Sequence, residues 1–355
     1  MQPSVLNRRQ FSLGIGATAL AGFGVARAQS EGRIVLGQSA AFSGPAAQLG
    51  IQFNQGAKLF FDQLNAAGGV GKRMVEIRTL DDGYEPDRCA ENTRKLIADD
   101  VFALFGYVGT PTSLAAVPLF NQAKVPFFAP FTGAESLRQP FNRLIFHVRA
   151  SYYDETALIV RQLVNLGIKK IAVFHQNDAY GKAGLDGVNK ALAEHKLPLA
   201  GAATVERNSV DVAAAVEKLV AAKPDAVVQI AAYGASAAFV RAARKAGFGG
   251  TFYNVSFVGT QALADELGKD GAGVVVSQVV PSPYQPSRQI TREFLDAIKK
   301  AGDKVQPNYS SMEGFLAARI FTEGLRQAAA SGKISRDSFI SGMEGLGSQV
   351  ISGFP

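Results

Sequence analysis

The sequence predicts an α/β fold of two lobes, in which each lobe is a parallel sheet covered by helices. Three observations support this prediction. The chain has 355 residues, of which 47% are hydrophobic and 19% charged, enough for two hydrophobic cores. Short apolar runs alternate along the chain with segments of helical periodicity. Residues 33–133 and 169–258 each pass through three or four β–α units of similar length, which indicates an approximate internal duplication.

The predicted strands are the short apolar runs of the chain. Helices are predicted between them, because apolar residues recur there at helical spacing. One such stripe consists of Ala57, Phe60, Phe61 and Leu64, and another consists of Val212, Val216, Leu219 and Val220. Both stripes end before Gly or Pro turns and are expected to face a core. In chain order the predicted strands are 34–36, 75–80, 101–105, 125–129, 144–148, 171–174, 226–230, 251–253 and 273–280.

Residues 1–28 have the pattern of an export signal. A basic stretch that contains Arg8 and Arg9 precedes a short apolar segment, which ends in small residues before Gln29. The apolar segment is too short to span a membrane stably. The two arginines resemble a twin-arginine signal, so export by that route or by the general secretory route is expected. We therefore predict an exported protein that begins near Gln29.

Composition argues against several classes of function. Removal of residues 1–28 deletes three arginines and no acid, so the formal net charge falls from +7 to +4. No Lys/Arg run with interleaved aromatic residues remains, which argues against nucleic-acid binding. The single cysteine, Cys89, cannot form an intramolecular disulfide. His147, His175 and His195 lack a metal-binding spacing, so structural roles are expected for all three.

The loops that follow the predicted strands are polar or aromatic, and ligands of open parallel sheets bind at this edge. Thr110 and Pro111 stand where a helix is expected to begin, as N-cap and first-turn residue. Thr132, with Glu135 three residues later, has the pattern of a capping box at a second helix. Two helix N-termini from neighbouring strands would direct N–H groups and hydroxyls to one place, which suits a small carboxylate.

Two tyrosines occupy corresponding loops of the second predicted lobe. Tyr180 and Tyr233 each lie just beyond a strand and each precede a glycine. An aromatic ring with a polar tip is suited to lining a pocket, and a packing role is the alternative.

No catalytic constellation stands out in the sequence. "GIGATALAG" fits a dinucleotide fingerprint but lies in the export signal, and "GGVGKR" lacks the Ser or Thr of a phosphate-binding loop. A G-x-S-x-G elbow does not occur. Asp81 and Asp82, followed by Gly83, are interpreted as turn residues. The sequence thus favours a binding protein over an enzyme.

Several segments together resemble the leucine/isoleucine/valine-binding group of periplasmic solute-binding proteins, which serve ATP-driven (ABC) importers. The resemblance spans about residues 33–355 and is carried by the order and spacing of "SAAFSGPAAQLG", "AAGGVGKRMVEI", "LDDGYEPDRCAENTRKLI", "GYVGTPTS", "APFTGAESL", "DAYGKAG" and "AAYGASAAFVRAARKAG". It implies two Rossmann-like, doubly wound parallel-sheet lobes, joined by a three-strand hinge and closing on a ligand. The expected segments are the signal 1–28, lobe one from 29–148 with 280–345, and lobe two from 149–279 with 346–355, whose last part is expected to be incomplete.

The resemblance also implies the residues of the ligand site. Thr110 stands where the family places a hydroxyl that binds the ligand carboxylate, and a second carboxylate-binding loop follows the next strand. Two tyrosines of lobe two match ligand-contacting tyrosines. The expected site residues are Thr110, Phe131, Thr132, Gly133, Tyr180, Tyr233 and Ser256.

Ser256 is the departure from the family pattern with the largest consequence. It aligns with the acid that holds the ligand ammonium in amino-acid binders, so the carboxylate half of the site looks kept and the ammonium half does not. Asp82 or Asp178 would be a substitute from a neighbouring loop, although each has a turn or cap role as the alternative. Because a buried ammonium without a facing acid is costly, the sequence favours a carboxylate with an apolar or aromatic body, lined partly by Phe257.

The resemblance implies a monomeric periplasmic protein that delivers an amino acid or a related carboxylate to the permease of an ABC importer. No cofactor, metal or nucleic acid is expected. A ligand-sensing regulator on the same fold is the alternative, but it would need a cytoplasmic partner, and the export signal argues against one. A Rossmann-type oxidoreductase would need G-x-G-x-x-G after the first strand, which "GQSAAFSG" does not supply.

Overall fold

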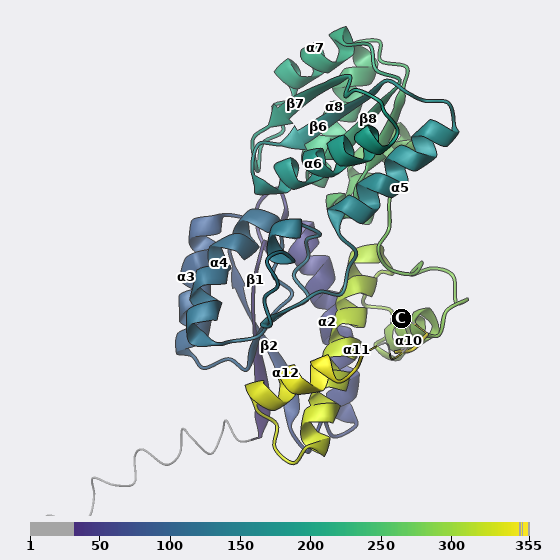
Figure 1. Cartoon of the computed structure of the whole chain (residues 1–355). Helices are drawn as coiled ribbons and strands as arrows, with labels where there is room; N and C mark the ends of the chain where they lie inside the picture. The colour runs from purple at the N-terminus through teal and green to yellow at the C-terminus, as the bar shows by residue number, and fades with distance from the viewer. Residues whose placement is uncertain (1–31, 348, 350, 354–355) are drawn as a thin grey trace, which may run out of the picture.

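Two separate parallel sheets form the framework of the protein (Figure 1). The computed structural model describes residues 32–347, 349 and 351–353, so the expected export signal lies outside the described residues. The strand orders are β2-β1-β3-β4-β5 in lobe one and β10-β9-β8-β6-β7 in lobe two. Each sheet places its second strand outside its first and then continues in sequence order. The shared order agrees with the predicted internal duplication.

All nine predicted strands are present, and one strand was missed. β7 lies at the edge of its sheet, where it pairs only with β6 and stays partly exposed. Its sequence, GAATV, therefore has no continuous apolar run. The strands are β1 (Arg33–Ala40), β2 (Met74–Asp81), β3 (Ala103–Phe105), β4 (Phe127–Phe128), β5 (Ile145–Phe146), β6 (Ile171–Gln176), β7 (Gly201–Val205), β8 (Ala226–Ile230), β9 (Thr251–Asn254) and β10 (Val274–Val276).

Helices cover both faces of each sheet, as the periodicity predicts (Figure 1). Most members of the two predicted stripes are buried, whereas Phe60 on α2 and Val220 on α7 are half-buried. The buried members are Ala57, Phe61, Leu64, Val212, Val216 and Leu219. Lobe one has α2 (Ala47–Ala66), α3 (Pro86–Ala98), α4 (Thr110–Ala123), α10 (Gln289–Lys300), α11 (Tyr309–Ala330) and α12 (Arg336–Glu344); lobe two has α5 (Tyr152–Asn165), α6 (Ala179–Glu194), α7 (Ala213–Ala221), α8 (Tyr233–Lys245) and α9 (Thr260–Leu267). Within the described residues, no helix is long and apolar enough to cross a membrane.

The chain passes between the lobes at 147–151, after β5, and again at 277–288, after β10. In the first crossover, the guanidinium of buried Arg149 donates two hydrogen bonds of 2.8 Å to Glu313 of α11. This pair fixes the crossover to lobe one. Near the chain end, Ser352 bonds Ile290 and Glu293 of α10. A third crossover and the lobe boundaries given above remain predictions.

The surroundings of Cys89 and of two histidines, His147 and His175, agree with structural roles. Cys89 is fully buried on α3. His147 and His175 each contact a backbone carbonyl, those of Leu137 and Gln176. Among the described residues, no group of His, Cys, Asp and Glu could hold a metal ion.

Helices α2 and α11 cross so closely that two positions of the contact require glycine. A Cβ atom at Gly314 would lie 2.0 Å from the carbonyl oxygen of Phe53, and one at Gly56 would lie 1.8 Å from that of Ser311. The obstructing atoms are backbone atoms, which cannot rotate away. The contact anchors the C-terminal helices to lobe one, since α11 carries the Glu313 that holds the first crossover.

We predict that Gly314→Ala lowers the free energy of unfolding by about 1–3 kcal/mol, because the new methyl group forces α2 and α11 apart. Gly234→Ala is the matched control, since Gly234 is also helical and a Cβ there would meet only Val210 at 3.6 Å. The control should leave stability unchanged or raise it by up to about 1 kcal/mol. Urea denaturation measures both, and equal effects of the two substitutions would contradict the packing argument.

Candidate functional site

A cluster of three hydroxyls lies where β3 and β4 deliver their loops to the interlobe edge. The Oγ1 atoms of Thr110 and Thr132 lie 2.6 Å apart, so that one hydroxyl donates to the other. Thr132 also donates to the phenol oxygen of Tyr152, at 3.2 Å. All three side chains are fully buried. Loops from neighbouring parallel strands end at the same edge of a sheet, and this brings the two threonines together as the sequence predicts.

The cap roles expected of the two threonines are wrong. Thr110 is the first residue of α4 rather than its N-cap, which is Gly109, and no side chain caps this helix. Thr132 does not begin a second α-helix, because only a short 3₁₀ turn, η1 (Glu135–Leu137), follows it, with Ala134 as N-cap. The Thr132 hydroxyl instead accepts from the N–H of Ala134, at 3.3 Å. Neither hydroxyl caps an α-helix, and the two bond each other instead.

Two glycines let the loops approach so closely. Gly109 has φ +97°, and a Cβ atom there would lie 2.2 Å from the Tyr84 ring. Gly133 accepts from the N–H of Tyr152 at 2.7 Å, and a Cβ atom would lie equally close to that nitrogen. Gly133 thus seats the loop of Thr132 against the start of α5, which puts the Tyr152 phenol within reach of the threonine pair.

Aromatic rings from both lobes meet beside the hydroxyl cluster. The ring of Phe257, in lobe two, lies 4.4 Å from that of Tyr180, 5.7 Å from that of Phe131 and 5.9 Å from that of Tyr84. Tyr180 lies 5.4 Å from Tyr152. The five side chains are almost fully buried. The phenol oxygen of Tyr180 finds no hydrogen-bond partner within the described part of the chain, so a buried polar atom is left over in this cluster.

Tyr233 lies at the rim of the interlobe contact rather than in the hydroxyl cluster. Its phenol oxygen accepts from the N–H of Gln48 on α2, at 3.4 Å. Its ring also borders a surface hollow of about 410 Å³ together with Val210 and Arg241. Tyr233 thus joins the two lobes, but its phenol bonds α2 and not the threonines.

Ser256 binds the carboxylate of Glu155 by two hydrogen bonds. The Ser256 N–H and hydroxyl donate to the two carboxylate oxygens at 2.7 and 3.0 Å, and Ser277 donates as well. Ser256 begins a 3₁₀ turn, η2 (Ser256–Val258), while Glu155 lies in the first turn of α5. Burial raises the pKa of Glu155. An acid is therefore present at this position, supplied from another element.

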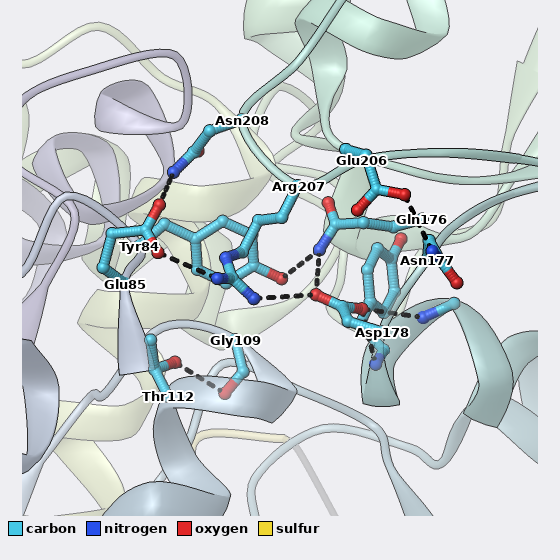
Figure 2. Close-up of polar contacts among 12 residues, drawn as sticks. Tyr84, Glu85, Gly109, Thr112, Gln176, Asn177, Asp178, Glu206, Arg207 and Asn208 are labelled. Atoms are coloured by element: carbon cyan, nitrogen blue, oxygen red, sulfur yellow. Dashed lines mark hydrogen bonds and ion pairs between the residues drawn. The ribbon is translucent and has the colours of Figure 1, made fainter. Parts of the chain in front are cut away.

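A polar network joins the lobes next to the aromatic cluster, as Figure 2 shows. Arg207 of lobe two lies between Glu85 of lobe one, at 2.8 Å, and Asp178, at 3.5 Å. Asn208 donates to Glu85 at 2.7 Å and to the Gly83 carbonyl at 3.0 Å. These ion pairs are partly buried, because the Arg207 and Asp178 side chains are only 23% and 11% accessible. The network therefore holds Glu85 of lobe one against Arg207 and Asn208 of lobe two.

The two acids considered as substitutes at the site have structural roles. Asp178 caps α6 by accepting from the N–H groups of Tyr180 and Gly181. Asp82 accepts from the Ser39 hydroxyl at 2.7 Å and from the N–H of Tyr84 at 2.8 Å. It is fully buried, and burial raises its pKa to about 6. The turn and cap interpretations are thus confirmed.

Sequence reasoning missed Arg149, Tyr152 and Glu155. The segment that begins at Ser151 forms a capping box with Asp154, and this pattern was available as a signal for the start of α5. It would have placed Tyr152 and Glu155 in the first turn of a helix. It would not have placed either one against the threonines or Ser256, since those contacts are made only by tertiary folding.

Two parallel-sheet lobes, connected by crossovers and facing each other with the loops that follow their strands, define a two-lobed ligand-binding protein. The chain belongs to the periplasmic binding protein family, whose model matches residues 33–354. Members of this family bind substrates and are not enzymes.

Relatives in three bacteria illustrate the similarity. A crystal structure described as a possible leucine/isoleucine/valine-binding protein from Rhodopirellula baltica is 35% identical, covers 91% of this chain and 89% of its own, and has a TM-score of 0.85. A substrate-binding periplasmic protein from Ralstonia solanacearum is 31% identical, with coverage of 90% and 91% and a TM-score of 0.85. The Leu/Ile/Val-binding protein of Escherichia coli is 22% identical, with coverage of 93% and 89%.

We predict that the free energy of unfolding of Asp82→Asn rises relative to that of wild type as the pH increases. A carboxyl with a folded pKa of about 6, against 3.8 ordinarily, stabilises the fold in its protonated form, and that contribution is lost between about pH 4 and pH 6. The free energy of unfolding of the variant, relative to wild type, should therefore increase by about 2–3 kcal/mol from pH 4 to pH 7.

Denaturant titrations at several pH values measure this difference. The two proteins must be compared with each other, because burial lowers the pKa of His147 to about 4 and gives the wild-type profile an opposite slope in the same interval. A difference that does not depend on pH would contradict the buried, protonated state of Asp82.

Proposed function

We propose that this protein is the periplasmic substrate-binding component of an ABC importer. It captures an amino acid or a related aliphatic or aromatic carboxylate between its lobes, closes by hinge motion and delivers the ligand to a membrane permease. It acts as a monomer, after export by a signal in residues 1–28. The site residues are Thr110, Phe131, Thr132, Gly133, Tyr180, Tyr233 and Ser256.

The hydroxyl pair at the start of α4 carries this proposal. Thr110 and Thr132 present two hydroxyls 2.6 Å apart, and the first turn of α4 has no side-chain cap to occupy its N–H groups. Both features favour an anion with two neighbouring oxygens, as a carboxylate has. The helix dipole adds to the attraction. In the present arrangement the two hydroxyls satisfy each other, and a bound carboxylate would take the place of that contact.

The aromatic cluster supports an apolar ligand body. Phe131 belongs to lobe one, while Tyr180 and Phe257 belong to lobe two, and the three rings meet at the interlobe contact. Rings contributed by both lobes bury an apolar ligand only when the lobes close, which couples binding to closure.

Named relatives support the same ligand class. They include Leu/Ile/Val-binding protein homologues of Brucella abortus, 25% identical over 334 residues. One solved protein of the same fold, 22% identical, is described in complex with benzoate. At that identity it supports the fold alone, and it illustrates that this fold accommodates an acid without an ammonium. The fold therefore does not determine whether the ligand is an amino acid or an acid without an amine; the residues of the site do.

We predict that Thr110→Val weakens every carboxylate that the protein binds, by at least about tenfold, because a hydroxyl that contacts the anion is lost. Calorimetry with leucine, phenylalanine and their des-amino analogues, 4-methylpentanoate and 3-phenylpropanoate, measures the effect. Thr322→Val is the matched control, since it removes an equally buried hydroxyl that bonds the Ala318 carbonyl within α11. Equal losses in both variants, or unchanged affinity in Thr110→Val, would contradict the proposed carboxylate site.

A further inference from the structure

Glu155 is a buried carboxylate that only neutral groups contact. Its side chain is almost completely buried, and its oxygens accept from the Ser256 N–H, the Ser256 hydroxyl and the Ser277 hydroxyl. Oε2 takes two of these bonds and Oε1 takes one. A carboxylate oxygen has two acceptor positions, so Oε1 retains a free position in this structure.

No cationic side chain among the described residues forms an ion pair with Glu155. Arg149 acts on it only at longer range: its Nε and Nη2 atoms donate to Glu313, and its buried Nη1 has no hydrogen-bond partner among the described residues. When all three side chains are ionised, this buried group of one arginine and two glutamates carries a net charge of −1. A buried charge without a counter-charge is costly, so an ionised Glu155 requires a cation beside Ser256.

The place of the required cation coincides with the proposed ligand site. Glu155 lies three residues after Tyr152 on α5, so the two side chains are neighbours on one face of that helix. Tyr152 contacts the threonine pair through Thr132. On the other side, Ser256 adjoins Phe257, which packs on Tyr180. The free position of Glu155 and the unpartnered phenol of Tyr180 thus lie in one cluster.

We infer that Glu155 is the residue that binds a ligand ammonium group, so that the ligand is a zwitterion with its carboxylate at Thr110 and Thr132. The acid of the ammonium half is therefore supplied from the start of α5 and presented by Ser256. The inference rests on the proposed function, and it decides which class of carboxylate the site prefers. An α-amino acid carries its two charges on adjacent carbons, which fits two charge-binding groups that meet at Tyr152.

A structural role is the competing explanation of Glu155. A protonated Glu155 would serve only to hold η2 and Ser277 against α5, and the site would then prefer an acid without an amine. The two explanations differ in their effect on ligand selectivity, which a purely structural role would not change.

The test is calorimetry with two pairs of probes, leucine against 4-methylpentanoate and phenylalanine against 3-phenylpropanoate, on wild type, Glu155→Gln and Ser277→Ala. Wild type is expected to bind the better amino acid at least about tenfold tighter than its des-amino analogue. Glu155→Gln should weaken the amino acid by at least about tenfold, equal to about 1.4 kcal/mol, while the des-amino analogue binds unchanged or tighter. Ser277→Ala keeps the charge and should keep the selectivity of wild type.

A wild-type preference for the des-amino acid, or an equal loss for both probes in Glu155→Gln, would overturn the inference. The wild-type preference is decisive even if the variant does not fold. A third outcome separates the two claims. If wild type binds carboxylates without selectivity for the amine, and Thr110→Val weakens that binding, the role of Glu155 is contradicted and the proposed function stands. If none of the four probes binds wild type, mass spectrometry of the small molecule extracted from protein purified from its own host decides: a primary amine supports the inference and its absence overturns it.

Discussion

The 2.6 Å contact between the hydroxyls of Thr110 and Thr132 is the interaction around which the interlobe site is built. It requires the loops of β3 and β4 to end at one point, which the parallel order of the sheet provides. Gly109, the residue before α4, has φ +97° and leaves no room for a Cβ atom beside Tyr84, so the loop that carries Thr110 needs glycine at this position. Gly133 then brings Tyr152 to the pair. The order of the sheet, the start of α4 and the loop at Gly133 thus together bring three hydroxyls into contact.

Closure of the lobes depends on side chains that are distributed between them. The apolar part of the contact between the lobes is made by rings that pack against the opposite lobe, such as Phe257 against Phe131 and Tyr84. The polar contribution comes from Arg207 and Asn208, which reach Glu85 from lobe two. Arg149 and Glu313 fix the crossover on the lobe-one side. The closed arrangement thus depends on contacts to which both lobes contribute, so a ligand that binds between the lobes shifts the balance between open and closed forms.

Much of the fold could be predicted from the sequence, because buried parallel strands are apolar runs, and nine were recognised on that basis. β7 could not be recognised, since an edge strand made of GAATV has no such run. Within the site, Thr110 and Thr132 could be found because loops after adjacent strands must converge. Their cap roles were predicted wrongly, because local patterns compete with tertiary contacts. The contact of Glu155 with Ser256 joins residues 101 positions apart and leaves no local signal. The sequence therefore indicated a missing acid, whereas the structure shows one supplied by α5.

Small-angle X-ray scattering with and without ligand tests the central claim, that two lobes close on a carboxylate held by lobe one. The chain contains no tryptophan, so intrinsic tryptophan fluorescence cannot report the motion. Titration with leucine or 4-methylpentanoate, whichever binds in calorimetry, should reduce the radius of gyration of wild type in proportion to occupancy. An unchanged radius of gyration at saturating ligand would contradict the account.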